Sequence, residues 1–148
     1  MTLEALQLDS RLKTDSTFVI DLRLCQVRLS HNAAVPWILL IPNQPAVFEI
    51  IDLSDINQRL LMQEISLSSQ VMRQLFRPTK LNIASLGNIV PQLHVHIIAR
   101  HMNDKAWPNP IWNSGVSAAY HSTALDERIN QLKEAFLKVL PTLSHDSI

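Results

Sequence analysis

The stretch NIVPQLHVHIIAR, residues 88–100, constrains the fold of this chain more than any other segment. Within it, Gln92, His94 and His96 alternate with branched apolar residues. Successive side chains of a β-strand point to opposite faces, so the three polar groups would share one face while the apolar groups bury on the other. A helix would scatter them, and the β-branched content also favours a strand. The stretch therefore predicts a strand whose polar face opens into a pocket.

Two kinds of apolar pattern surround this stretch. Period-two alternation indicates strands, and recurrence every three or four residues indicates helices. In the first alternation the apolar parity changes near Leu24–Cys25, which predicts a bulge or a turn there. Segment 48–53 fits a short strand or an extended lead-in to a helix capped by Ser54 and ended by Pro78. The other expected elements are strands over 18–29, 36–42 and 81–84, and a helix over about 124–140, ended by Pro141.

The order of these elements indicates the fold class. Helices do not alternate singly with strands, so the sheet should be antiparallel and the class α+β. A chain of 148 residues, 47% of them hydrophobic, suits one domain with a real core. We expect a single domain over residues 1–148, with its core at about 15–112.

Composition excludes several function classes. The chain has 13 basic and 13 acidic residues, which gives no support for a nucleic-acid scaffold or an anionic membrane surface as partner. The lone Cys25 excludes an intrachain disulfide and zinc sites built from cysteines, and Gly87 and Gly115 alone cannot build a glycine-rich phosphate loop. The first residues lack the apolar core of a signal peptide, and no apolar run is long enough to span a bilayer. We expect a cytoplasmic protein.

Three explanations fit the paired histidines taken alone. They could form a solvent-facing surface of the sheet. They could bind zinc, with His31 or His101 as the third ligand. They could also catalyse attack at phosphorus, because a neutral imidazole that donates from one nitrogen to a carbonyl aims the lone pair of the other nitrogen outward.

A resemblance to a known family favours the third explanation. The segment 81–100, the strand Pro-Trp-Ile-Leu-Leu-Ile-Pro and the motif Trp-Pro-x-Pro-x-Trp resemble the histidine triad (HIT) family of nucleotide hydrolases and transferases, in a bacterial branch. The resemblance spans about Asp15 to Trp112. It implies a five-stranded antiparallel sheet with two main helices, a nucleotide or nucleoside phosphate as ligand, no metal or cofactor, and a homodimer.

The family pattern His-φ-His-φ-His-φ-φ, with φ apolar, assigns roles to individual residues by position. His94 takes the place of the nucleophile, His96 that of the last histidine, which contacts phosphate, and Gln92 stands where the first histidine should be. The resemblance also implies polar substrate contacts from Asn82, Asn88, His31 and Asn32.

Three functions remain open on this basis. The first is a nucleotide hydrolase or nucleotidyl transferase that acts at the α-phosphate through a covalent nucleotidyl-His94. The second is a nucleotide-binding module that kept the pocket but lost turnover together with the first histidine. The third is a metal-binding protein that uses His94 and His96.

Overall fold

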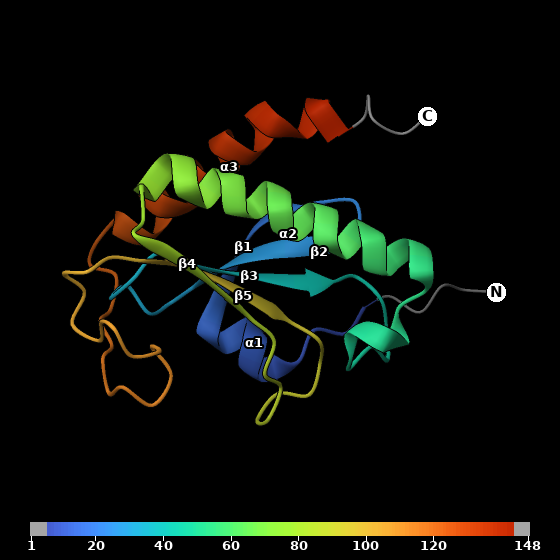
Figure 1. Cartoon of the computed structure of the whole chain (residues 1–148), viewed down its shortest axis with the longest axis horizontal. Coiled ribbons are helices and arrows are strands. Elements are labelled where there is room, and N and C mark those ends of the chain that lie inside the picture. The colour runs from blue at the N-terminus through green and yellow to red at the C-terminus, as the bar shows by residue number, and fades with distance from the viewer. Residues whose placement is uncertain (1–5, 144–148) are drawn as a thin grey trace.

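The computed structural model describes residues 6–143, which form one five-stranded sheet with helices on both sides (Figure 1). The strand order is β1-β2-β3-β5-β4, and every neighbouring pair is antiparallel. The strands are β1 (Ser16–Asp21), β2 (Cys25–Ser30), β3 (Trp37–Pro42), β4 (Lys80–Ala84) and β5 (Val95–Arg100). The helices are α1 (Ser10–Asp15), the 3-10 turn η1 (Ile50–Asp52), α2 (Asp55–Phe76) and α3 (Ala124–Leu143).

The two long helices cover one face of the sheet (Figure 1). Val95, Ile97 and Ala99 of β5 point to that face and join the main core, which also contains Leu132 and Phe136 of α3. The expected α+β fold, with a five-stranded antiparallel sheet and two main helices, is confirmed. No helix within residues 6–143 has the length and apolar content needed to cross a bilayer.

The opposite face of the sheet holds the polar side chains of the central strands. Strand register aligns Arg28 of β2, Leu39 of β3 and His96 of β5 in one row across this face. Helix α1 contributes Leu12, which packs on Leu39. Residues of α1 and of the loop after β5 border a cavity on this face.

Most expected boundaries hold, and three differ. The parity change near Leu24–Cys25 is a turn between β1 and β2, as predicted. Segment 48–53 forms neither a strand nor an extended lead-in, because Asp52 Oδ2 accepts hydrogen bonds from the backbone N–H groups of Phe48 (3.0 Å) and Glu49 (2.8 Å) and folds the segment into η1. Helix α3 continues past Pro141 to Leu143, since a proline in the last turn removes only one intrahelical donor.

The central strand also begins later than predicted. β5 starts at Val95, so Gln92 and His94 precede it. Pro91 has no N–H to donate to a neighbouring strand, and the N–H of Leu93 donates to the carbonyl of Val47, outside the sheet (3.0 Å). Only the second half of the alternating stretch is therefore regular strand.

Ser54 caps helix α2, and Pro78 follows its end, as the sequence predicts. The Ser54 side chain accepts a hydrogen bond from the N–H of Asn57, and Arg77 closes the helix in the left-handed conformation, with φ of 45°. This end of α2 is also tied to the sheet, because His101 Nε2 lies 2.8 Å from the carbonyl oxygen of Phe76. The helix is thereby fixed against the end of β5.

Candidate active site

His94, just before β5, and His96, near its start, lie side by side. Their ring centroids are 4.9 Å apart, with the planes inclined by 75°, and each residue is only 7% exposed. Both line one cavity of about 400 Å³ on the face of the sheet opposite α2 and α3. The structure thus brings together the two histidines that the sequence assigns to catalysis.

The hydrogen bond of His94 defines which ring nitrogen carries the proton. Nδ1 of His94 lies 2.7 Å from the carbonyl oxygen of Gln92. A carbonyl oxygen can only accept, so Nδ1 must donate. In the neutral ring, the lone pair is then on Nε2. This is the arrangement that a nitrogen nucleophile requires.

His96 has the opposite arrangement. The indole Nε1–H of Trp37 donates to Nδ1 of His96 over 3.0 Å, and an indole nitrogen can only donate. Nδ1 of His96 is therefore unprotonated, and the ring proton is on Nε2. Burial, together with the charge that His94 can carry, lowers the pKa of His96 to about 3. His96 thus stays neutral near pH 7 and presents an N–H donor from Nε2.

Two tryptophans hold the His96 ring in place. Trp37 and Trp112 both meet it edge-on, at centroid distances of 5.6 Å and 5.0 Å, and they contact each other at 5.9 Å. Trp112 comes from the loop after β5, and it also lines the cavity. The downstream Trp-Pro-x-Pro-x-Trp motif therefore contributes directly to the wall of the site.

A buried ion pair shapes this loop. Asp104 accepts two hydrogen bonds from Arg100, at 2.8 Å from Nε and 3.0 Å from Nη2, and also takes the backbone N–H groups of Ala106 and Trp107. The hydrogen bonds from Arg100 are the largest cause of the lowered pKa of Asp104, about 2. Arg100 is 1% exposed, so its guanidinium stabilises the loop by pairing with Asp104 and is not accessible to a substrate phosphate.

The four residues expected to contact substrate are distributed over three places. Asn88 lines the histidine cavity. Asn82 instead accepts a hydrogen bond from Nη1 of Arg100 (3.0 Å) and supports the ion pair. His31 and Asn32 line an adjoining cavity of about 480 Å³ that shares Asp15, Ser30 and Trp37 with the first.

The two residues of the adjoining cavity already have partners. Nε2 of His31 lies 2.7 Å from the hydroxyl oxygen of Thr17. Oδ1 of Asn32 accepts hydrogen bonds from the backbone N–H groups of Ala34 (3.0 Å) and Ala118 (3.2 Å). Asn32 therefore joins the loop after β2 to the segment that precedes α3.

Gln92 is separated from the two histidines. Its side chain lines a different cavity, beside residues 7–11, and bonds to the backbone there. Gln92 contributes to the histidine site through its backbone carbonyl, which fixes His94. The sequence places Gln92 in the site, and the structure shows that its main-chain and side-chain groups serve different purposes.

Trp37, Arg11 and Asp15 are among the cavity residues that the sequence did not single out. Trp37 is the hydrogen-bond partner of His96, and Arg11 and Asp15 come from α1. A sequence reading recognises the strand that contains Trp37, but not that the indole of this strand reaches a histidine on the next one. Helix α1, with six residues, is too short to give a clear helical period.

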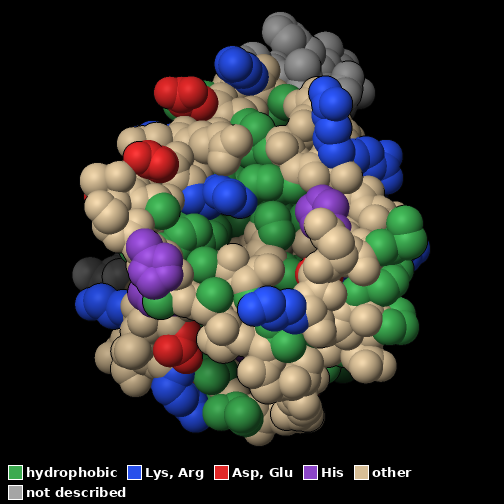
Figure 2. All heavy atoms as spheres, turned by 90° about the vertical axis from the view of Figure 1, so that its left-hand side faces the viewer, with side chains coloured by type: hydrophobic (Ala, Val, Ile, Leu, Met, Phe, Trp, Pro, Cys, Tyr) green, Lys and Arg blue, Asp and Glu red, His purple; other side chains and the backbone are tan. Residues whose placement is uncertain are grey.

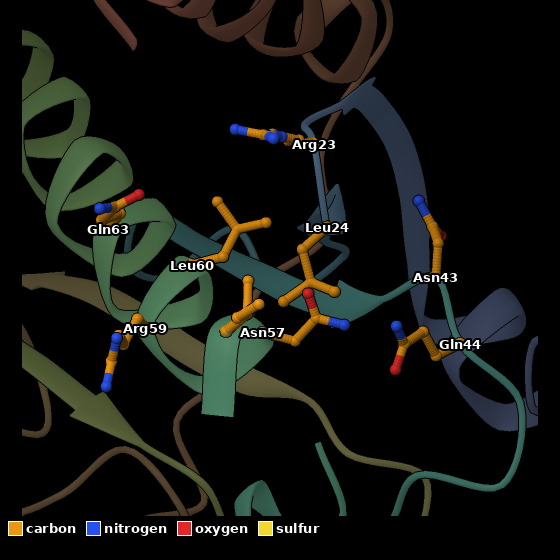
Figure 3. A pocket seen from close by; sticks show the side chains of 9 residues that line it. Arg23, Leu24, Asn43, Gln44, Asn57, Arg59, Leu60 and Gln63 are labelled. Carbon is orange, nitrogen blue, oxygen red and sulfur yellow. The ribbon is translucent and has the colours of Figure 1, made fainter. Parts of the chain in front are cut away.

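The surface has other features besides the histidine cavity. A cavity of about 490 Å³ between the β1–β2 turn and the start of α2 has Leu24 and Leu60 among its lining residues, together with arginines and amides (Figure 3). The face seen in Figure 2 has an apolar hollow at its centre, bordered by basic and histidine side chains. Within residues 6–143, no three His, Cys, Asp or Glu side chains gather where they could hold a metal ion.

Comparison with known proteins identifies the family. The HIT domain model matches residues 11–103, so the chain belongs to the HIT family. A histidine triad protein from Bradyrhizobium japonicum is 45% identical, with a TM-score of 0.86 over 89% of this chain and 98% of that one.

Two other bacterial structures give the same result. A histidine triad protein from Marinobacter aquaeolei is 35% identical, with a TM-score of 0.86 over 90% of this chain and 98% of that one. One from Sinorhizobium meliloti is 32% identical, with a TM-score of 0.82 over 92% and 98%. No curated protein matched the sequence. The family resemblance expected from residues 81–100 is confirmed.

Proposed function

We propose that this protein is a nucleotide hydrolase or nucleotidyl transferase that acts at the α-phosphate of a nucleotide through a covalent nucleotidyl-His94 intermediate. The observation that carries the proposal is the pair of opposite tautomers. His94 offers a lone pair on Nε2, and His96 beside it offers an N–H from Nε2. Membership of the HIT family supports nucleotide chemistry for this pair.

The first chemical step would be attack by Nε2 of His94 on the α-phosphorus. A P–N bond forms, and the bond from phosphorus to the leaving group breaks, with the electron pair leaving on that group. The ring gains positive charge while Nδ1–H still donates to the Gln92 carbonyl, which stabilises that charge. In the second step, water or another hydroxyl acceptor attacks phosphorus and releases its proton to solvent, and the P–N bond breaks with its electron pair returning to Nε2 of His94.

His96 would act as a hydrogen-bond donor to a phosphate oxygen. With a pKa of about 3, the ring holds no second proton to give to a leaving group at neutral pH. The neutral Nε2–H can still stabilise negative charge on phosphate in the transition state. Of the two roles for this histidine, phosphate contact therefore fits better than proton donation.

The adjoining cavity would accept the nucleoside part of the substrate. It joins the histidine cavity at Asp15, Ser30 and Trp37, and His31 and Asn32 lie along it. Asn88 would contact the phosphate from the loop before β5. Asn82 would act indirectly, by supporting Arg100 and the loop that carries Trp112.

A trapping experiment tests the proposal. The protein is mixed with a nucleotide substrate labelled in its α-phosphate, quenched in denaturant at alkaline pH, and mapped by mass spectrometry. We expect the label on His94, its loss in His94→Ala, and its retention in His121→Ala, which alters an exposed histidine outside both cavities. Label elsewhere, or turnover by His94→Ala, would contradict the proposal.

The second candidate is a nucleotide-binding module without turnover. Two observations favour it: among residues 6–143, only two histidines line the cavity, and the Gln92 side chain lines a different one. This candidate predicts that a nucleotide raises the melting temperature of the protein while no label is trapped. The trapping experiment thus distinguishes the two candidates.

We also propose a homodimer, on the strength of the family and of the free edge strand β4. Within residues 6–143, β4 has a neighbouring strand on one side only, and Ile83 on it is 47% exposed. An exposed apolar edge strand is a ready surface for pairing with another chain. Light scattering of the purified protein at several concentrations should give twice the mass of one chain; a mass of one chain throughout would contradict this part of the proposal.

A further inference from the structure

The side chain of Gln92 holds a distant segment of the chain. Its Oε1 accepts a hydrogen bond from the backbone N–H of Asp9 (2.8 Å), and its Nε2 donates to the carbonyl of Gln7 (3.4 Å). Both ends of one amide thus bind the main chain of residues 7–9. The amide of glutamine has an accepting oxygen and a donating nitrogen on the same carbon. A histidine in this position would lack such a group.

The held segment places Arg11 at the mouth of the histidine cavity. Asp9 caps α1 by accepting the N–H of Arg11 (2.9 Å), and its carboxylate binds the Arg11 guanidinium at 3.0 Å from Nε and 2.9 Å from Nη2. Nη1 of Arg11 donates to the carbonyl of Ile89 (2.7 Å), in the loop just before the histidines. Gln92, Asp9 and Arg11 therefore form a chain of contacts that ends at the cavity.

Arg11 is the cation of this cavity. When His94 and His96 are neutral, the charged residues among those that line it are Arg11 and Asp15. A guanidinium has five N–H donors, and the bonds to Asp9 and Ile89 use three of them. The side chain is half exposed, so the remaining two donors are accessible to a ligand.

The position of Arg11 separates it from the expected nucleoside side. The adjoining cavity that contains His31 and Asn32 does not include Arg11 among its lining residues. Arg11 instead binds the carbonyl of Ile89, in the loop before β5. An anion bound there would belong to the part of the substrate that lies beyond the reacting phosphate.

We infer that Gln92 is a positioning residue that fixes the segment of residues 7–11, and that Arg11 on this segment binds a second anionic group on the leaving-group side of the substrate. The inference rests on the proposed function and deepens it. It selects substrates whose leaving group is itself negatively charged, such as dinucleoside polyphosphates, over nucleoside phosphoramidates with a neutral amine.

The test compares two substrates in three proteins. Arg11→Ala should lower kcat/KM for a dinucleoside triphosphate about 10-fold or more, as expected for loss of a charge-assisted hydrogen bond, and leave a neutral-amine phosphoramidate within about 2-fold. Lys13→Ala, which removes a cation from the same helix outside the cavity, should change neither. An equal loss on both substrates in Arg11→Ala would overturn the inference.

Gln92→Ala tests the positioning step. We expect it to reproduce part of the selective loss, and we expect Gln92→Ala/Arg11→Ala to be no worse than Arg11→Ala alone, because both changes act through one guanidinium. The backbone amide of Asp9 should exchange with solvent faster in Gln92→Ala. If the losses in kcat/KM of the two single variants multiplied in the double variant, Gln92 would not position Arg11. An unchanged exchange rate of the Asp9 amide would show the same.

A binding measurement keeps this inference separate from the question of turnover. In His94→Ala, the further change Arg11→Ala should lower the affinity for the dinucleoside triphosphate relative to that for a nucleoside monophosphate. The expected loss is about 10-fold or more, the same as the loss in kcat/KM. A ratio that does not change would refute the Arg11 contact. Absence of label on His94 in the unaltered protein would refute the proposed chemistry and leave the binding result standing.

Discussion

The hydrogen bond from Trp37 to His96 can be removed with little change of shape by Trp37→Phe. The phenyl ring keeps aromatic surface against His96 and Trp112, and the indole N–H is lost. Nδ1 of a histidine that is 7% exposed would then lack its donor. Leaving a buried acceptor unsatisfied costs about 1–3 kcal/mol, which should appear as a lower free energy of unfolding in urea.

The same change should slow formation of the nucleotidyl-His94 adduct. The donor from Trp37 fixes the His96 tautomer that directs Nε2–H at the substrate. If the donor contributes about 1–3 kcal/mol to that arrangement, single-turnover labelling should slow by about 5- to 150-fold. Trp112→Phe is the matched control, because it makes the same chemical change on the other ring that meets His96 edge-on.

A double-variant cycle decides whether Trp37 acts through His96. In His96→Ala, which removes the donor to phosphate, the further change Trp37→Phe should slow labelling by less than about 2-fold. Undiminished slowing in the His96→Ala background would refute the reasoning. So would an adduct that forms at the normal rate in Trp37→Phe alone.

Three further predictions concern the supporting structure. Asp104→Ala should lower the free energy of unfolding by about 3–5 kcal/mol in a urea titration, because it leaves the buried Arg100 unpaired; a loss below about 1 kcal/mol would contradict the burial of this pair. The pKa of Asp104 is lowered from 3.8 to about 2, so its contribution to stability is present above pH 4 and is lost as the pH falls toward 2. The acid transition of Asp104→Asn should therefore be shallower than that of the unaltered protein, and equal slopes would exclude Asp104 as the titrating group. Phe136→Ala should cost about 3–5 kcal/mol by thermal or urea unfolding, since the ring is fully buried between α3 and the sheet; retention of full stability would show that α3 does not close the core.

The sequence predicts the sheet and the shared face of His94 and His96 well because both depend on short-range patterns. The alternation of polar and apolar residues around His94 and His96 predicts that they share one face of the sheet. The change in which residues of the alternation are apolar, at Leu24–Cys25, locates the first turn. The proline after Arg77 locates the end of α2. Each of these signals is contained within a few residues, so no knowledge of the tertiary structure is needed to use it.

The remainder of the site depends on contacts between distant residues. The bond from Trp37 to His96 joins residues 59 positions apart, and that from Asp9 to Gln92 joins residues 83 apart. Periodicity carries no information about such pairs, because strand register and loop paths decide them. For the same reason the sequence associates Asn82 with phosphate, whereas in the fold it binds Arg100.

The proposed attack and the phosphate contact require opposite tautomers of His94 and His96. Two-bond ¹H–¹⁵N correlation spectra of the histidine side chains, recorded near pH 8 where an ordinary imidazole is neutral, measure this directly. His94→Ala and His96→Ala assign the signals. We predict a proton on Nδ1 of His94 and on Nε2 of His96, with the His96 pattern unchanged down to pH 5 because its pKa is about 3. A proton on Nε2 of His94, or on Nδ1 of His96, would contradict the proposed attack and the phosphate contact that supports it.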